Sequence, residues 1–123
     1  MISFIRSRIK SFRHAFTGLW HVIKTQKNAW LHAVATFLVI LIALWLHLPR
    51  TEWAILFLAI GSVWTAEFIN TSLEAIVDLA SPRHHLLAKV GKDVGAAAVL
   101  ISSFFAALIG ILLLLIPAIQ KLF

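Results

Sequence analysis

Residues 53–79 read WAILFLAIGSVWTAEFINTSLEAIVDL, and this stretch decides how the chain is built. Its first half contains no charged side chain, whereas its second half carries three acids and an amide, Glu67, Asn70, Glu74 and Asp78. About 20 predominantly apolar residues are enough for a helix to cross the hydrocarbon core of a bilayer. The stretch therefore predicts a membrane-spanning helix that carries a polar face toward its end.

The rest of the chain is also unusually apolar. Of the 123 residues, 61% are hydrophobic and 13% are charged, whereas about a quarter of the residues in a soluble domain are charged. The chain contains no cysteine, which excludes disulfides and thiolate metal sites. We therefore expect an all-α membrane protein that forms a single domain over residues 1–123.

Two further stretches have the length and apolarity of membrane spans. Residues 30–48 and 94–116 contain no Asp, Glu, Lys or Arg. Pro117 is expected to end the last span. Ser81 followed by Pro82 predicts a helix start, because serine is a favoured N-cap and proline suits the first helical position. The expected membrane helices cover residues 30–48, 53–79 and 94–116.

The N-terminal segment differs from the spans, because its apolar side chains recur every three or four positions. The members of this stripe are Ile2, Ile5, Ile9, Phe12, Phe16, Leu19 and Ile23. A narrow apolar stripe flanked by cations cannot cross a bilayer, but it can lie in the headgroup plane of an anionic membrane. We expect residues 1–27 to form an amphipathic helix at the membrane surface.

The basic residues predict the orientation of the spans. The cations before the first span and between the second and third spans are Arg6, Arg8, Lys10, Arg13, Lys24, Lys27, Arg83, Lys89 and Lys92. The opposite side has only Arg50 and Lys121. Because positive charge gathers on the cytoplasmic side of an inner or plasma membrane, the N-terminus and residues 80–93 are expected to face the cytoplasm.

The polar face of the second span predicts chemistry. Glu67, Asn70, Glu74 and Asp78 follow one another at intervals of three, four and four, which keeps them on one side of a helix over about 16 Å. An acid at the centre of a membrane helix costs about 2.5–3.5 kcal/mol. Asn70 alone would fit a polar seam between helices, but three carboxylates repel one another. Such a column favours binding of a cation or a proton.

A second polar cluster follows the acidic column along the chain. It consists of Arg83, His84, His85, Lys89, Lys92 and Asp93. Cations beside carboxylates suit a phosphorylated ligand bound through a divalent metal, although a basic loop resting on anionic lipid is the simpler alternative. No G-x-x-x-x-G-K-[ST] loop is present, and the histidines lack the spacing of a zinc site.

Small residues line one side of the third span. They are Gly91, Gly95, Ala98, Ser102, Ala106 and Gly110, at intervals of three or four. Spacing of this kind lets membrane helices approach closely, so we interpret the stripe as a packing surface.

The polar residues form a recognisable pattern. Residues 67–78 read E-x-x-N-x-x-x-E-x-x-x-D, and residues 88–93 read A-K-x-x-K-D. This pattern resembles the prokaryotic diacylglycerol kinase family, and the resemblance covers almost the whole chain, including residues 11–18 and 25–32. The segments Asp78-Leu-Ala-Ser-Pro and Asn28-Ala-Trp-Leu-His32 resemble the undecaprenol-kinase branch of that family.

The resemblance implies a homotrimer of three-span subunits with active sites shared between neighbouring chains. It implies transfer of the γ-phosphoryl group of MgATP to the primary hydroxyl of a membrane lipid. By position, Glu67 matches the general base, Asn70 a residue near the reacting centre, and Glu74 a Mg²⁺ ligand. The ATP-binding residues that the resemblance implies are Glu74, Arg83, His84, His85, Lys92 and Asp93. Asp78 completes the acidic face without an assigned role.

Two positions depart from the family pattern. Gln26 stands where some members have a metal-binding glutamate, and its amide oxygen can ligate Mg²⁺ only without charge. Ser7, between Arg6 and Arg8, stands where the family has an arginine. Both departures affect the expected details of metal and ATP binding.

Two other functions compete with a lipid kinase. A small ion or proton channel could use the acidic column, but three spans without an inverted repeat argue against a transporter. A non-catalytic membrane assembly protein would leave the acidic face and the pair Lys92-Asp93 without a role. The favoured interpretation is therefore an ATP-dependent lipid kinase, with undecaprenol and diacylglycerol both open as substrates.

Overall fold

The computed structural model of the protein describes residues 2–83 and 85–123. The regular structure in these ranges is helical: α1 (Ile2–Thr25), α2 (Lys27–Leu46), α3 (Arg50–Ala80), α4 (Leu86–Gly110), the π-helical turn η1 (Ile111–Leu115) and α5 (Ile116–Leu122). Three helical stretches, Lys27–Leu46, Arg50–Ala80 and Leu86–Leu122, are long and apolar enough to cross a membrane. The predicted all-α membrane fold with three long apolar helices is confirmed.

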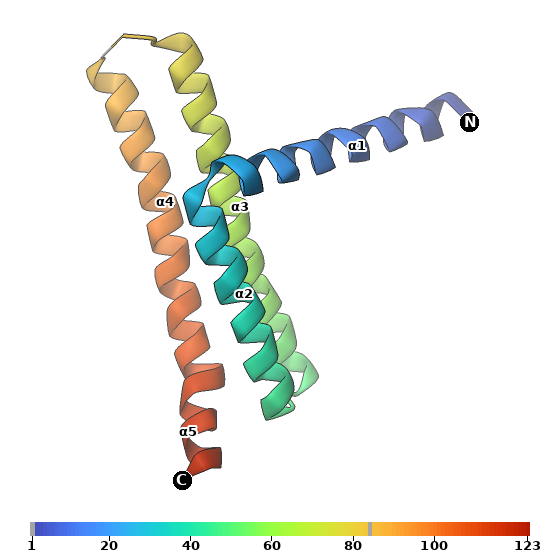
Figure 1. Ribbon diagram of the computed structural model, residues 1–123, viewed down its shortest axis with the longest axis vertical. Coiled ribbons are helices and arrows are strands. Elements are labelled where there is room, and N and C mark those ends of the chain that lie inside the picture. Colours follow the sequence, from blue (N-terminus) through green and yellow to red (C-terminus); the bar gives the residue numbers. More distant parts are fainter. Residues whose placement is uncertain (1, 84) are drawn as a thin grey trace.

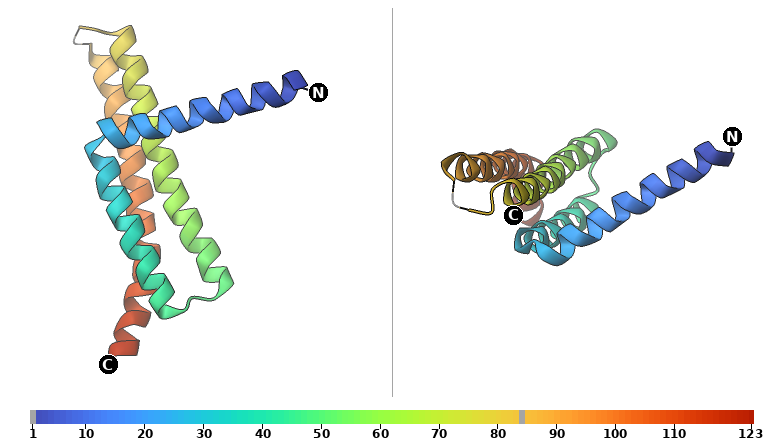
Figure 2. Two further views of the ribbon diagram at one scale, coloured as in Figure 1. Left: turned by 45° about the vertical axis from the view of Figure 1, so that its right-hand side comes forward. Right: turned by 90° about the horizontal axis from the view of Figure 1, so that it is seen from above.

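The three long helices run side by side, and α1 points away from them (Figures 1 and 2). The contact between α3 and α4 is the most extensive. It uses the predicted small-residue stripe, because a Cβ atom added at Gly95 would lie 2.4 Å from Asn70 Oδ1. Ser102 Oγ donates to Ser62 Oγ at 3.3 Å across the same helix pair. The packing role of the stripe is confirmed at these two positions, whereas Gly110 faces open space.

Helix α3 is longer than a membrane span requires. Its 31 residues correspond to about 46 Å, whereas the hydrocarbon core of a bilayer is about 30 Å thick. Figure 1 shows the last turns of α3 and the first turns of α4 extending past the level at which α2 begins. About three turns of α3 can therefore lie outside the hydrocarbon core, and these turns carry Glu74 and Asp78.

The predicted start of the third helix at Ser81 and Pro82 is wrong. Ser81 is instead the C-cap of α3, and its hydroxyl donates to the carbonyl oxygen of Arg83 at 2.9 Å. The next helix starts at Leu86, where His85 Nδ1 accepts a hydrogen bond from the Leu87 N–H at 3.2 Å. The capping acceptor expected from a serine is thus supplied by an imidazole further along the chain.

The predicted end of the third helix at Pro117 is also wrong. The helix continues to Leu122, although proline lacks the N–H that an α-helical interior needs. The chain accommodates Pro117 by widening into η1 immediately before it, so that Pro117 falls in the first turn of α5, where no intrahelical N–H bond is required.

Helix α1 leaves most of its apolar side chains uncovered by the rest of the chain. Phe4, Ile9, Phe12 and Phe16 are each more than 60% exposed. Near its other end, Val22 is buried where α1 meets the bundle. A helix covers Ile2–Thr25 of the predicted residues 1–27, and its amphipathic role at the membrane surface stays a prediction.

Candidate active site

The most buried large side chain of the described residues is a carboxylate. Glu67, on α3, is 1% exposed. Its Oε2 atom lies 3.7 Å from Nε2 of His32, which comes from the second turn of α2. In the described part of the chain neither atom has a hydrogen-bond partner, and 3.7 Å is too long for a direct bond. Burying such groups unpaired is costly, so the arrangement is typical of a functional site.

One turn further along α3, an amide and a carboxylate are joined. Asn70 Nδ2 donates to Glu74 Oε1 at 3.1 Å, as expected for residues four positions apart on a helix. Asn70 is buried against Gly95 of α4, and its Oδ1 atom has no partner among the described residues. Glu74 is half-buried. The Asn70 amide is therefore held in place by Glu74 on one side and by the close approach of Gly95 to its oxygen on the other.

The last member of the acidic column meets a cation from the second polar cluster. Lys92 of α4 forms an ion pair with Asp78 of α3, and their side chains are 39% and 65% exposed. An exposed pair of this kind contributes little to stability. The ion pair matters for position, because it holds Lys92 at the same end of the α3–α4 pair as Glu74.

The remaining predicted residues surround this end of the helix pair less closely. Arg83 and Asp93 are exposed, and His85 uses Nδ1 to cap α4. Gln26 is half-buried at the junction of α1 and α2, where its side chain makes no capping hydrogen bond. His84 lies outside the described residues. The structure thus brings together the acidic face of α3 and the first turns of α4.

The donors present fit Mg²⁺ held partly by its ligand. Over residues 2–83 and 85–123, no three His, Asp or Glu side chains gather as a metal-binding group. Mg²⁺ usually takes only one or two carboxylates from a protein and completes its shell with water and phosphate oxygens. The half-buried Glu74 carboxylate is an oxygen ligand of the required kind.

Sequence reasoning gave His32 no chemical role. It appeared only within the segment resembling the undecaprenol-kinase branch. The available signal was a histidine within an otherwise apolar span, since ionisable residues in membrane helices are commonly functional. Its partner, Glu67, is 35 positions away along the chain and was recognisable only in three dimensions.

The contact between Gly95 and Asn70 gives a first prediction. Gly95→Ala is expected to lower the rate of the predicted phosphate transfer at least about tenfold, because the new methyl group must displace the Asn70 amide from its place beside Glu74. Gly61→Ala is the control, since a Cβ atom there meets nothing within 4 Å. Turnover of both variants at the wild-type rate would show that the placement of Asn70 is unimportant.

These features define a class: a helical membrane protein that gathers carboxylates, an amide and a lysine along the C-terminal half of α3. Residues 13–114 match the prokaryotic diacylglycerol kinase family. The chain belongs to this family.

The relatives include kinases of two lipids. The chain is 40% identical to the undecaprenol kinase of Bacillus subtilis over 106 residues, which cover 86% of each chain. It is 40% identical to a diacylglycerol kinase of Synechocystis, over 87% of this chain and 62% of that protein. It is 30% identical to the diacylglycerol kinase of Escherichia coli K12, over 80% of this chain and 92% of that protein.

Membership confirms the family and the branch recognised from the sequence. It also confirms the predicted enzyme class, a membrane lipid kinase that transfers phosphate to an alcohol group. The two competing interpretations, a channel and a non-catalytic assembly protein, are not supported.

Proposed function

We propose that the enzyme uses MgATP to phosphorylate the terminal hydroxyl of undecaprenol or diacylglycerol at the cytoplasmic surface of the membrane, with Glu67 as the general base. The observation that carries this proposal is the Glu67 carboxylate. It is 1% exposed, its Oε2 has no hydrogen-bond partner among the described residues, and it lies in a helix long enough to cross the bilayer. A carboxylate held in this way is available to take a proton from a lipid hydroxyl.

The reaction needs little covalent help from the protein. Phosphoryl transfer passes through a loose transition state, so catalysis consists mainly of positioning and charge neutralisation. The hydroxyl oxygen forms a bond to the γ-phosphorus as the bond from that phosphorus to the β–γ bridging oxygen breaks and ADP leaves. The hydroxyl proton passes to Glu67 and then to water. Asn70, fixed by its bond to Glu74, helps to place the reacting groups.

The metal is assigned to the Glu74 end of the column. Mg²⁺, when bound, supplies positive charge to the transferring phosphate. Glu74 is the proposed carboxylate ligand, and the Asn70 amide nitrogen, which donates to Glu74 Oε1, helps to hold it in place. Gln26 is a weaker, uncharged candidate whose side chain is not used as a helix cap.

The ATP phosphates are assigned to the cationic start of α4 and the loop before it. Lys92 is a compact point charge, and its exposed pairing with Asp78 can be exchanged for a phosphate at small cost. The other proposed ATP contacts are Arg83, His84, His85 and Asp93.

The same arrangement supports an orientation and an assembly. α1 joins the bundle near the level at which α2 begins (Figure 1), so a surface location of α1 would place Glu67 and His32 near the cytoplasmic interface. The cations on this side agree with the positive-inside rule. We further propose a homotrimer with active sites shared between neighbouring chains, as the resemblance to the family implies.

The choice of lipid is testable by competition. Undecaprenol and diacylglycerol in equal amounts in the same micelles should both have access to the enzyme, and the two phosphorylated products can be separated. We expect most of the phosphate in undecaprenol, the substrate named for the Bacillus subtilis relative. Preferential phosphorylation of diacylglycerol would assign the enzyme to the other branch.

A further inference from the structure

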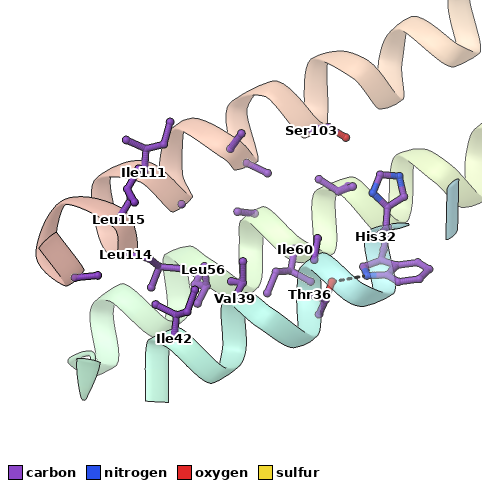
Figure 3. Close-up of a pocket in the computed structure, with 18 residues that line it drawn as sticks. His32, Thr36, Val39, Ile42, Leu56, Ile60, Ser103, Ile111, Leu114 and Leu115 are labelled. Atoms are coloured by element: carbon purple, nitrogen blue, oxygen red, sulfur yellow. Dashed lines mark hydrogen bonds between the residues drawn. The ribbon is translucent and has the colours of Figure 1, made fainter. Parts of the chain in front are cut away.

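His32 borders a cavity as well as the general base. A cavity of about 420 Å³ lies between α2, α3 and the C-terminal half of α4 with η1 and α5. This volume falls in the range of small-molecule sites, about 300–1,000 Å³. Figure 3 shows His32 and Ser103 toward one end of the cavity, whereas apolar side chains such as Leu114 and Leu115 lie toward the other.

Some polar groups around His32 have hydrogen-bond partners, and others have none among the described residues. Trp64 Nε1 donates to Thr36 Oγ1 at 3.2 Å, so the indole N–H is satisfied and the Thr36 hydroxyl oxygen has a donor. The Trp64 ring also packs edge-on against the imidazole of His32, with centroids 6.1 Å apart. His32 Nε2 and Ser103 Oγ, in contrast, have no hydrogen-bond partner in the described part of the chain.

His32 lies between the cavity and the carboxylate. It lines the cavity, whereas Glu67 is not one of the lining residues. The distance of 3.7 Å between His32 Nε2 and Glu67 Oε2 is too long for one hydrogen bond. Neither atom is exposed, so a hydroxyl oxygen can enter only if the two side chains move slightly apart. An oxygen inserted in this way would lie about 2.8 Å from both atoms and could accept from one group while donating to the other.

We propose that His32 binds the hydroxyl of the lipid substrate: Nε2–H donates to the hydroxyl oxygen, the hydroxyl donates to Glu67 Oε2, and the cavity takes the apolar carbons beside it. This inference rests on the proposed function of Glu67. On phosphate transfer the hydroxyl proton moves to Glu67, while His32 retains its own proton. Two buried groups that lack partners thereby gain them only when substrate is bound.

The lining of the cavity suits a mostly apolar ligand. The lining residues with polar side chains are His32, Thr36, Trp64 and Ser103, and the others are apolar. A long-chain primary alcohol places hydrocarbon directly beside its hydroxyl and can fill such a space.

The test compares two amides at one position. In His32→Gln the amide nitrogen lies near the former Nε2, whereas in His32→Asn it stops near the former Nδ1. Both side chains are polar and uncharged. With undecaprenol as substrate, His32→Asn is expected to lower kcat/KM for the alcohol about 10–100-fold and to leave KM for ATP within about twofold. His32→Gln should stay within about fivefold of wild type.

The control is His14→Asn, since His14 is exposed on α1. Equal loss in both His32 variants, no loss in His32→Asn, or a loss confined to KM for ATP would overturn the assignment. Absence of transfer by the wild-type enzyme would instead refute the proposed function of Glu67.

A second variant provides an independent test of the cavity if the His32 variants do not assemble. Val39→Phe fills the cavity without touching the polar groups. It should raise KM for undecaprenol about tenfold or more while KM for ATP is unchanged. An unchanged KM for undecaprenol would exclude the cavity as the site of the hydrocarbon.

Discussion

Glu67→Gln is expected to reduce the rate of lipid phosphorylation by a factor of about 100–10,000, the usual contribution of a general base. The substitution keeps the size of the side chain and an oxygen beside His32, but an amide cannot take the hydroxyl proton. Because the side chain is 1% exposed, water has little access to replace it as the base. The measurement is the initial rate of phosphate transfer from ATP to lipid in micelles.

Glu52→Gln provides the matched control. It is the same exchange on the same helix, in the first turn of α3 and far along the helix from Glu67. We expect its rate to match the wild type. Helix content and elution volume should be the same for both variants, which separates a catalytic loss from a failure of assembly. A Glu67→Gln enzyme of normal rate would exclude Glu67 as the base.

Glu74→Gln is expected to lower the rate about 100-fold or more at a Mg²⁺ concentration that does not saturate the wild type. The amide oxygen can still accept the bond from Asn70, which is 3.1 Å from Glu74 Oε1, so the local geometry should persist while the charge is lost. Titration with Mg²⁺ measures the effect, and the half-saturating concentration should rise.

The exposed Asp78 provides a comparison within the same acidic column. Asp78→Asn removes one carboxylate from the same helix face but breaks only the exposed pair with Lys92. Its half-saturating Mg²⁺ concentration should change far less than that of Glu74→Gln. An equal rise in both variants would mean that the column acts only through its total charge, without Glu74 as a specific ligand.

The sequence predicted a helix well where a long apolar run alone determines it. The long uncharged and mostly apolar runs over 30–48 and 53–66 favour a membrane helix, because lipid offers no partner for an unpaired backbone group. Local signals were less reliable. Ser81 and Pro82 have the chemistry of a helix start, but the hydroxyl of Ser81 bonds within the loop and His85 caps the helix instead.

Pro117 failed as a signal for a different reason. A proline ends a helix only if its missing hydrogen bond cannot be accommodated. Here η1 widens the preceding turn and the helix continues to Leu122. Nothing in the apolar run around Pro117 distinguishes these two outcomes.

The candidate site was predictable along one helix but not between helices. The spacing of Glu67, Asn70 and Glu74 assigns them to one face, and the structure has them there. The spacing does not identify the residues that these side chains meet on other helices, because those contacts depend on how the helices pack. Glu67 meets His32 of α2, whereas Asn70 meets Gly95 of α4. One face of a helix therefore serves two different interfaces.

The most direct test of lipid-kinase activity is transfer of label from γ-radiolabelled ATP to undecaprenol in detergent–lipid micelles, with Mg²⁺ and with excess chelator. We predict label in the lipid for the wild type with Mg²⁺, little label when the metal is removed, and little for Glu67→Gln under either condition. Absence of label in any lipid, from wild-type protein that is folded and assembled, would contradict the assignment of this chain as a lipid kinase that uses the acidic face of α3.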